Sequence, residues 1–151
     1  MTDLEWPYNL PIFRSAHRSV SPDGRLWAEI DPAYEAGMSD PTYGTLRLST
    51  GLQIERCNPS FLWSDDSRYL AVPQFFYRFM IFRRQRLLVI DVQSQAVFAS
   101  PDFTYYFQPE SFSDGRVVAI KNPFNSAQQA VWSIPTDLTR FSRVIIRGIK
   151  T

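Results

Sequence analysis

Aspartates at recurring positions are the first candidates for chemistry in this sequence. Asp23, Asp66 and Asp114 each lie in a short turn motif, and Asp65 precedes Asp66. Carboxylates that converge in one cleft can act as a general acid and base or can hold a divalent ion. Because these aspartates occupy equivalent places in a repeat, we expect them to form turns on separate units. A small carboxylate-dependent hydrolase or lyase is the alternative function.

The chain has one histidine, His17, and one cysteine, Cys57. A cysteine nucleophile needs a base, and His17 is the single imidazole that could supply it. One imidazole also leaves no histidine pair for a metal site. The sequence contains no glycine-rich phosphate loop and no Gly-x-Ser-x-Gly motif. We therefore expect a structural histidine, a buried structural thiol, no catalytic residue, no metal and no cofactor.

Two stretches gather charged and aromatic side chains between predicted strands. The stretch from Glu29 to Asp40 is acidic, and the stretch from Gln74 to Arg86 carries four arginines beside five aromatic residues. Charge steers the encounter of two proteins, while aromatic side chains supply contact area. Both stretches are therefore predicted to be long loops that bind a protein partner. The predicted partner-binding residues are Asp31, Tyr34, Glu35 and Asp40 in the first loop and Tyr77, Arg78, Arg83 and Arg84 in the second.

Both stretches also have plainer interpretations. The acidic stretch is equally well explained as a solvated loop. In the arginine-rich stretch, aromatic residues such as Phe75, Phe79 and Phe82 could fill the core while the arginines protect an edge strand from aggregation. Arginine among aromatic residues can also bind nucleic acid. The net charge of +1 argues against that partner.

A motif that occurs three times determines where the recurring aspartates lie in the predicted fold. Its copies are Ser21–Ala28 (SPDGRLWA), Ser64–Ala71 (SDDSRYLA) and the shorter Ser113–Ala119 (SDGRVVA). The second copy begins 43 residues after the first, and a period in the forties is the length of one four-stranded β-unit. The sequence thus predicts an all-β fold of three consecutive four-stranded antiparallel units. They span approximately residues 14–57, 58–101 and 102–151 of a single β domain.

Apolar runs rich in aromatic and β-branched residues, separated by turn residues, predict the strands. In the first of these units, Leu26, Ala28 and Ile30 should face the core, with Trp27 and Glu29 on the other face of the strand. A short helical turn is expected near 32–36 or 126–129. The predicted strands are His17–Val20, Leu26–Ile30, Gly44–Ser49, Gln53–Cys57, Phe61–Trp63, Tyr69–Phe76, Leu87–Val92, Ala96–Ser100, Gln108–Phe112, Val117–Lys121, Ala130–Ile134 and Val144–Ile149.

The motif Ser-Pro-Asp-Gly-Arg-Leu-x-Ala before a strand, and Leu-Leu-Val-Ile-Asp-Val before a polar turn, resemble blades of the WD-like β-propeller repeats of Tol-system proteins and peptidases. The resemblance implies that the aspartate holds the turn between the two inner strands. Propellers take about four to eight blades, so three units must close differently. We expect a compact monomer closed into a sandwich or barrel, and a ring-forming scaffold subunit is the alternative.

Composition places the chain among globular proteins. With 44% hydrophobic and 21% charged residues, 151 residues can bury a core. The near-neutral charge provides no field that would hold an anionic membrane. No segment reaches the ~20 apolar residues of a membrane helix, and the N-terminus lacks the pattern of a signal peptide. We expect a cytoplasmic protein that does not bind membranes.

Longer stretches carry a second resemblance. The segments Ser-Pro-Asp-Gly-Arg-Leu, Gly-Thr-Leu-Arg-Leu-Ser and Cys-Asn-Pro-Ser-Phe-Leu-Trp-Ser-Asp-Asp-Ser-Arg-Tyr-Leu-Ala-Val-Pro-Gln are similar to small bacterial proteins encoded beside polymorphic or secreted toxins. Such neighbours act as immunity proteins. The resemblance implies a non-catalytic module that neutralises a cognate toxin by stoichiometric binding, which requires a complementary surface and no catalytic machinery.

Overall fold

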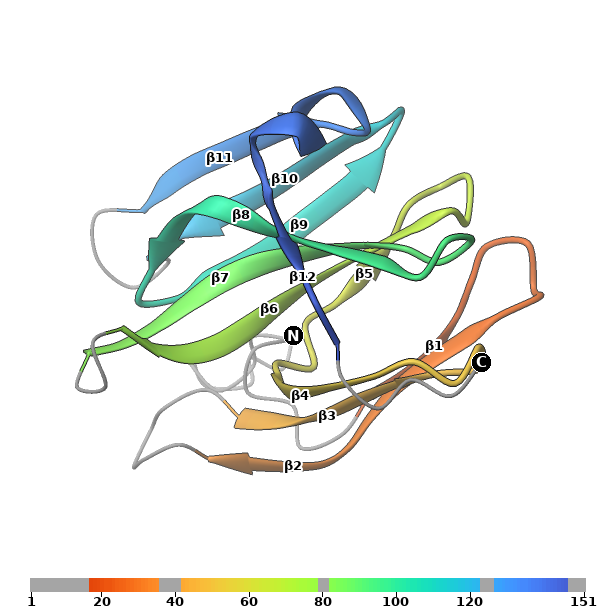
Figure 1. Cartoon of the computed structure of the whole chain (residues 1–151), viewed down its shortest axis with the longest axis horizontal. Helices are drawn as coiled ribbons and strands as arrows, with labels where there is room; N and C mark the ends of the chain where they lie inside the picture. Colours follow the sequence, from red (N-terminus) through yellow and green to blue (C-terminus); the bar gives the residue numbers. More distant parts are fainter. Residues whose placement is uncertain (1–16, 36–41, 79–81, 123–126, 147–151) are drawn as a thin grey trace, which may run out of the picture.

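The computed structural model describes residues 17–35, 42–78, 82–122 and 127–146, without the side chains of 31–35, 77–78 and 82–83. Within these ranges the regular elements are twelve β-strands and one short 3₁₀ helix, so the predicted all-β class is confirmed. The strands form three layers, with β2, β3 and β4 at the bottom, β6, β7 and β8 in the middle and β9, β10 and β11 at the top (Figure 1). No helix among the described residues has the length and apolar character needed to cross a membrane.

Nine strands form one antiparallel sheet in the order β1-β2-β3-β4-β6-β7-β8-β12, with β5 paired to β6. A single residue pair, Cys57 with Gln74, joins β4 to β6, so the sheet continues from the bottom layer to the middle layer through one narrow strand pairing. The strands of this sheet are β1 His17–Val20, β2 Trp27–Glu35, β3 Thr42–Leu48, β4 Gln53–Cys57, β5 Leu62–Trp63, β6 Tyr69–Arg78, β7 Phe82–Asp91, β8 Ala96–Thr104 and β12 Ser142–Val144.

The top layer is a three-stranded sheet of β9 (Phe107–Ser113), β10 (Arg116–Lys121) and β11 (Gln128–Ser133). The predicted fourth strand of this unit begins two residues earlier than expected, as β12, and pairs with β8 of the middle layer. The prediction of three four-stranded units is therefore wrong for the third. After the 3₁₀ helix (Thr136–Arg140), the buried Phe141 packs against Trp132 with ring centres 5.5 Å apart, and β12 follows.

Neither sheet closes among the described strands, so the structure contains no barrel and no propeller there. The two predicted long loops are also wrong, because paired strands occupy most of both stretches. β2 pairs with β3 as far as Glu35, with a register shift between Ile30 and Ala33. Pro32, which has no N–H to donate, lies at this irregularity. Residues 32–35 of the helical turn expected near 32–36 are thus strand, and residues 128–129 of the turn expected near 126–129 belong to β11. β6 pairs with β7 over their full lengths.

The middle layer is buried on both faces. Leu88 and Ile90 of β7 point into a core shared with the bottom layer, whereas Leu87 and Val89 point into a core shared with the top layer. This alternation follows from the period of two in a strand, and it explains why the run is continuously apolar. Ala28 and Ile30 are fully buried in the first core, as the sequence predicts.

One buried polar side chain links all three layers. Gln85 of β7 is fully buried, and its Nε2 donates to the hydroxyl of Tyr43 on β3 at 2.8 Å. The Oε1 atom of Gln85 accepts a hydrogen bond from the backbone N–H of Phe107 on β9. Because a buried amide must satisfy its donors and acceptors, this side chain specifies how the layers are positioned relative to one another.

Candidate functional site

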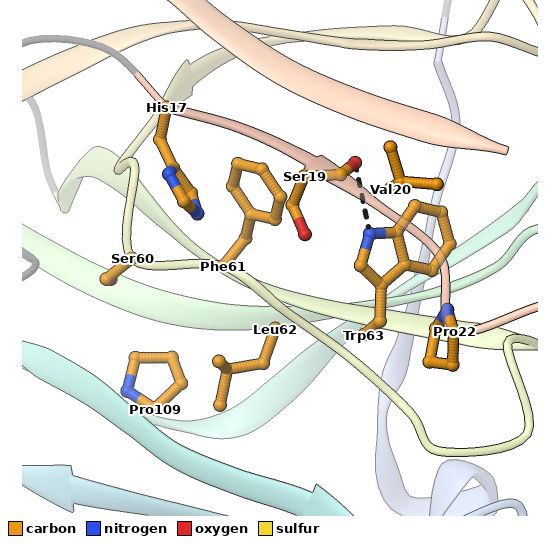
Figure 2. Close-up of a pocket in the computed structure, with 9 residues that line it drawn as sticks. All are labelled: His17, Ser19, Val20, Pro22, Ser60, Phe61, Leu62, Trp63 and Pro109. Carbon is orange, nitrogen blue, oxygen red and sulfur yellow. Dashed lines mark hydrogen bonds between the residues drawn. The ribbon is translucent and has the colours of Figure 1, made fainter. Parts of the chain in front are cut away.

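A hollow of about 350 Å³ lies where β1, β5 and β9 approach one another (Figure 2). His17 lines it, and its ring centre lies 4.9 Å from that of Phe61. Trp63 donates its Nε1–H to the backbone oxygen of Ser19 at 3.4 Å across the same wall. None of the described residues that line this hollow carries a carboxylate. The described residues around His17 in this hollow thus include the Phe61 ring and the two serines Ser19 and Ser60.

Cys57 is fully buried in the core between the bottom and middle layers. Its thiol lies 3.8 Å from the backbone oxygen of Glu55. Burial raises the pKa of the thiol far above its ordinary value, because the interior disfavours a thiolate. The predicted buried thiol is confirmed, and Cys57 remains protonated at neutral pH.

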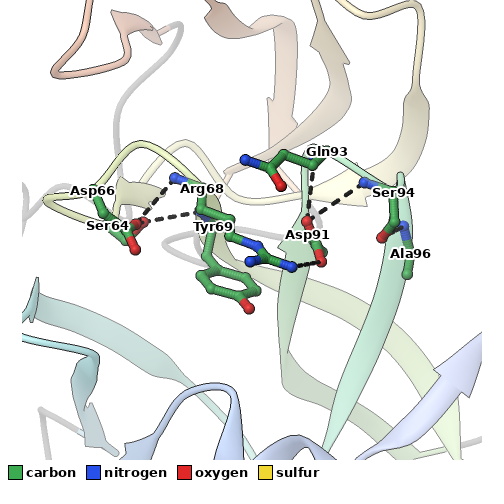
Figure 3. Close-up of polar contacts among 8 residues, drawn as sticks. All are labelled: Ser64, Asp66, Arg68, Tyr69, Asp91, Gln93, Ser94 and Ala96. Atoms are coloured by element: carbon green, nitrogen blue, oxygen red, sulfur yellow. Dashed lines mark hydrogen bonds and ion pairs between the residues drawn. The ribbon is translucent and has the colours of Figure 1, made fainter.

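The repeated aspartates hold the turns in which they lie. In the second copy, the Oδ1 atom of Asp66 accepts from the Ser64 hydroxyl at 2.6 Å and from the Arg68 N–H at 3.0 Å (Figure 3). The Ser64 hydroxyl also accepts from the Tyr69 N–H at 2.9 Å. The hydroxyl of Ser64 holds the pKa of Asp66 below its usual value. Asp66 therefore forms these hydrogen bonds within its own turn.

The first copy repeats this arrangement atom for atom. Asp23 accepts from the Arg25 N–H at 3.0 Å and from the Ser21 hydroxyl at 2.7 Å, and these bonds lower its pKa. The Leu26 N–H donates to the Ser21 hydroxyl at 3.1 Å. The Ser-x-Asp-x-Arg spacing thus produces one local geometry in two different places. This result confirms the predicted turn-forming role of Asp23 and Asp66.

Backbone donors connect the turns of successive units. The N–H of Asp23 donates to the hydroxyl of Ser67, and the N–H of Asp114 donates to Oδ2 of Asp65, both at 2.9 Å. The described residues hold no group of three or more His, Cys, Asp or Glu side chains that could bind a metal. Asp23, Asp66 and Asp114 line neither the hollow beside His17 nor the groove around Arg86 that follows below. These contacts give the repeated aspartates a structural role in the turns.

A second hairpin turn in the middle layer is held by Asp91. Its Oδ2 atom accepts from Nη2 of Arg68 at 3.2 Å, and its Oδ1 atom accepts from the N–H groups of Gln93 and Ser94 at 3.1 and 3.5 Å (Figure 3). Arg68 therefore bridges the repeated turn to the β7–β8 turn, and both turns are fixed relative to each other.

The described residues among those predicted to bind a partner lie on β2, β6 and β7, and all except Asp31 are near a strand end. Asp31, Tyr34 and Glu35 belong to β2, and Asp40 lies outside the described residues. In the second stretch, Tyr77 and Arg78 end β6, while Arg83 and Arg84 begin β7. The end of β2 and the β6–β7 end lie on the same side of the molecule, at the left in Figure 1. The backbone thus brings the two predicted groups to one side.

An arginine–aromatic patch lies on this part of the middle layer, formed by Phe76, Arg84, Arg86, Phe103 and Tyr105. The Arg84 guanidinium lies 4.0 Å from the ring centre of Tyr105, and that of Arg86 lies 5.4 Å from that of Phe76. Phe76 and Phe103 meet edge to face at 6.1 Å. Tyr105 is 58% exposed and Phe103 is 39% exposed. The patch thus presents cations and aromatic rings to solvent together.

Strand register builds the patch. Phe76 pairs with Arg84 across β6–β7, and Arg86 pairs with Phe103 across β7–β8. Side chains directly opposite on neighbouring strands share one face of the sheet. Farther along this face, Leu88 enters the core between the middle and bottom layers. The sequence predicted Arg84 here but missed Phe103 and Tyr105, which lie on β8 and just after it, outside the arginine-rich stretch.

A groove of about 600 Å³ continues from Arg86 toward the bottom layer. We call it the arginine groove, after Arg47 of β3, Arg56 of β4 and Arg86 of β7, which all line it. Its wall includes Ile145 after β12, which is 76% exposed. Sequence reasoning missed this site, because its arginines come from three strands and share no local pattern.

Comparisons with known proteins leave the family open. No protein-family model, no curated protein and no solved structure matches this chain. The resemblances to propeller blades and to immunity proteins therefore stay predictions from the sequence.

Proposed function

We propose that this chain is a non-catalytic protein-binding module, and that it serves in the bacterial cytoplasm as an immunity protein that neutralises a cognate toxin by stoichiometric binding. The observation that supports this proposal most is the arginine–aromatic patch. Tyr105 is 58% exposed and lies beneath the guanidinium of Arg84. Tyrosine and arginine are the residue types that contribute most binding energy at protein interfaces.

The patch is built on a rigid support. Its residues lie on and beside three strands that are paired with one another, and its arginines already stack on its rings. Side chains that are held in place before binding lose less conformational entropy when a partner arrives. Occlusion of a toxin requires such a preorganised surface and requires no catalytic groups.

The acidic end of β2 lies on the same side of the molecule as the β6–β7 end (Figure 1). Tyr34 of β2 pairs with Tyr43 of β3, and the Tyr43 hydroxyl accepts from Gln85 of β7 at 2.8 Å. The acidic end of β2 is thereby tied to the arginine-rich strand. A toxin that covers both would meet Asp31, Tyr34, Glu35 and Asp40 with basic groups, and would meet Tyr77, Arg78, Arg83 and Arg84 as a second contact area.

Coexpression with the product of the neighbouring gene tests the proposal. Pulldown and growth protection are measured for the wild type, for the double variant Phe103→Ser/Tyr105→Ser and for the control Val131→Ser. Phe103 and Val131 are both 39% exposed, but Val131 lies on β11 of the other sheet. We expect capture and protection to be lost in the double variant and retained in the control.

Two outcomes would contradict this assignment. Full protection by a folded double variant would remove the patch as the binding surface. Failure of the wild type to form any complex would favour the ring-forming scaffold, and sedimentation would then show an oligomer in place of the expected monomer.

A further inference from the structure

The arginine groove contains positive charge that the described chain does not neutralise. The ion pairs among the described residues join Arg18 to Glu29, Arg68 to Asp91, Lys121 to Asp102 and Arg140 to Asp137. None of them involves Arg47, Arg56 or Arg86. Glu55 also lines the groove, but its carboxylate lies within 4.0 Å of no described cation. Three arginines therefore face one glutamate without an ion pair.

Arg86 is fixed in place for recognition. Its Nε–H donates to Oε1 of Gln74 at 2.9 Å, and Nε2 of Gln74 donates to the backbone oxygen of Glu55 at 3.0 Å. The terminal amino groups of Arg86 make no hydrogen bond to a described residue. Partial burial and the nearby charge of Arg56 lower the pKa of Arg86, which is the direction expected where cations gather without a counter-charge.

A bulge between β3 and β4 shapes the other wall. Gly44 pairs with Cys57 and Leu46 pairs with Ile54, so two residues of β4 lie opposite one residue of β3. Arg56 is one of these two and has a φ of 62°. Bulges redirect side chains out of the regular alternation. Both Glu55 and Arg56 are consequently exposed at the groove.

We propose that the arginine groove receives an acidic segment of the protein partner, with carboxylates on Arg47, Arg56 and Arg86 and an apolar side chain on Ile145. This inference rests on the proposed function. Guanidinium groups bind carboxylates through paired, charge-assisted hydrogen bonds. The adjoining isoleucine gives an apolar contact that a phosphate chain would not use, and the whole protein carries only +1 net charge, too little to attract nucleic acid.

The test uses the full chain and a labelled peptide of alternating Asp, Glu and Leu, with oligo-dT and inorganic pyrophosphate as competing probes. We expect the peptide to bind, with an affinity that falls as salt is added. Arg47→Gln and Arg86→Gln should each weaken peptide binding about tenfold, and the control Arg116→Gln on β10 should not. If Arg86→Gln does not fold, Arg47→Gln combined with Arg56→Asn replaces it, because asparagine tolerates the positive φ of that position.

Two results would overturn the inference. One is peptide binding that the groove variants leave unchanged or that does not occur at millimolar concentration. The other is tighter binding of oligo-dT or pyrophosphate than of the peptide. Partner capture that still depends on Phe103 and Tyr105 would then show that the proposed function stands without this inference. Peptide binding without any captured partner would instead retain the groove and remove the immunity function.

Discussion

Replacing Ser64 by alanine should destabilise the fold more than the same change at Ser21, and the change at Ser113 should have little effect. The three serines begin the three copies of the repeat. The hydroxyls of Ser64 and Ser21 each make two hydrogen bonds, one to the aspartate and one from a backbone N–H. The Ser113 hydroxyl makes no hydrogen bond to a described residue. The repeat therefore supplies its own matched controls.

The expected magnitudes follow from burial. Each lost hydrogen bond costs about 1 kcal/mol, and a buried N–H left without a partner adds about 1–3 kcal/mol. Tyr69 is only 5% exposed in the middle layer, so Ser64→Ala should lower the free energy of unfolding by about 3–5 kcal/mol. Leu26 is half-buried, and water can replace the lost acceptor there, so Ser21→Ala should cost about 1–2 kcal/mol. Ser113→Ala should cost less than about 0.5 kcal/mol.

Urea unfolding followed by tryptophan fluorescence and far-UV circular dichroism measures the three free energies. The slopes should agree among the variants, so that the midpoints report stability alone. Equal losses at the three positions, or a loss at Ser113 as large as that at Ser64, would refute the reasoning from the turn geometry.

The same variant changes the pH dependence. The pKa of Asp66 is lower in the folded protein than its ordinary value of 3.8. Its contribution to stability is therefore complete above pH 3.8 and is lost as the pH falls through the folded-state pKa. Because the Ser64 hydroxyl is the largest cause of the shift, Ser64→Ala should flatten the stability profile in this acidic window. An unchanged profile would contradict this cause.

Three further substitutions or treatments test other parts of the structure. Gln85→Leu removes the hydrogen bond to the Tyr43 hydroxyl and takes the acceptor away from the buried N–H of Phe107, so the free energy of unfolding should fall by about 2–5 kcal/mol, measured by denaturant titration. Gly115→Ala should lower the melting temperature more than Gly24→Ala: both have positive φ, but an added Cβ at Gly115 would lie 3.1 Å from the Ile134 oxygen. Cys57 should react with Ellman's reagent only after urea unfolding, because the folded thiol is fully buried; rapid reaction of the native protein would refute that placement.

The sequence by itself determined the strands and the repeated turns. The predicted bounds of His17–Val20 and Gln53–Cys57 agree with β1 and β4, because the turn residues that flank these strands act over a few neighbouring positions. The Ser-x-Asp-x-Arg turn was also predictable, since all of its hydrogen bonds except those to neighbouring turns close within six residues.

Tertiary structure decided how far the strands run. The acidic stretch looks like a loop in isolation because Pro32 and the acidic residues disfavour strand, and the arginine-rich stretch looks like a loop because its charges suggest a solvent-exposed segment. Pairing of β2 with β3 and of β6 with β7 makes them strand. Local propensity was overridden there by cross-strand hydrogen bonds, which a reading of one segment at a time cannot include.

Long-range packing also decided the partner of β12 and the position of the arginine groove. β12 joins β8 and not the third unit, after Phe141 has packed against Trp132. Arg47, Arg56 and Arg86 come from three strands and meet because the bottom and middle layers are joined at Cys57 and Gln74. Such a site depends on sheet order and on the position of a bulge, and neither is encoded in the local pattern around any one of its arginines.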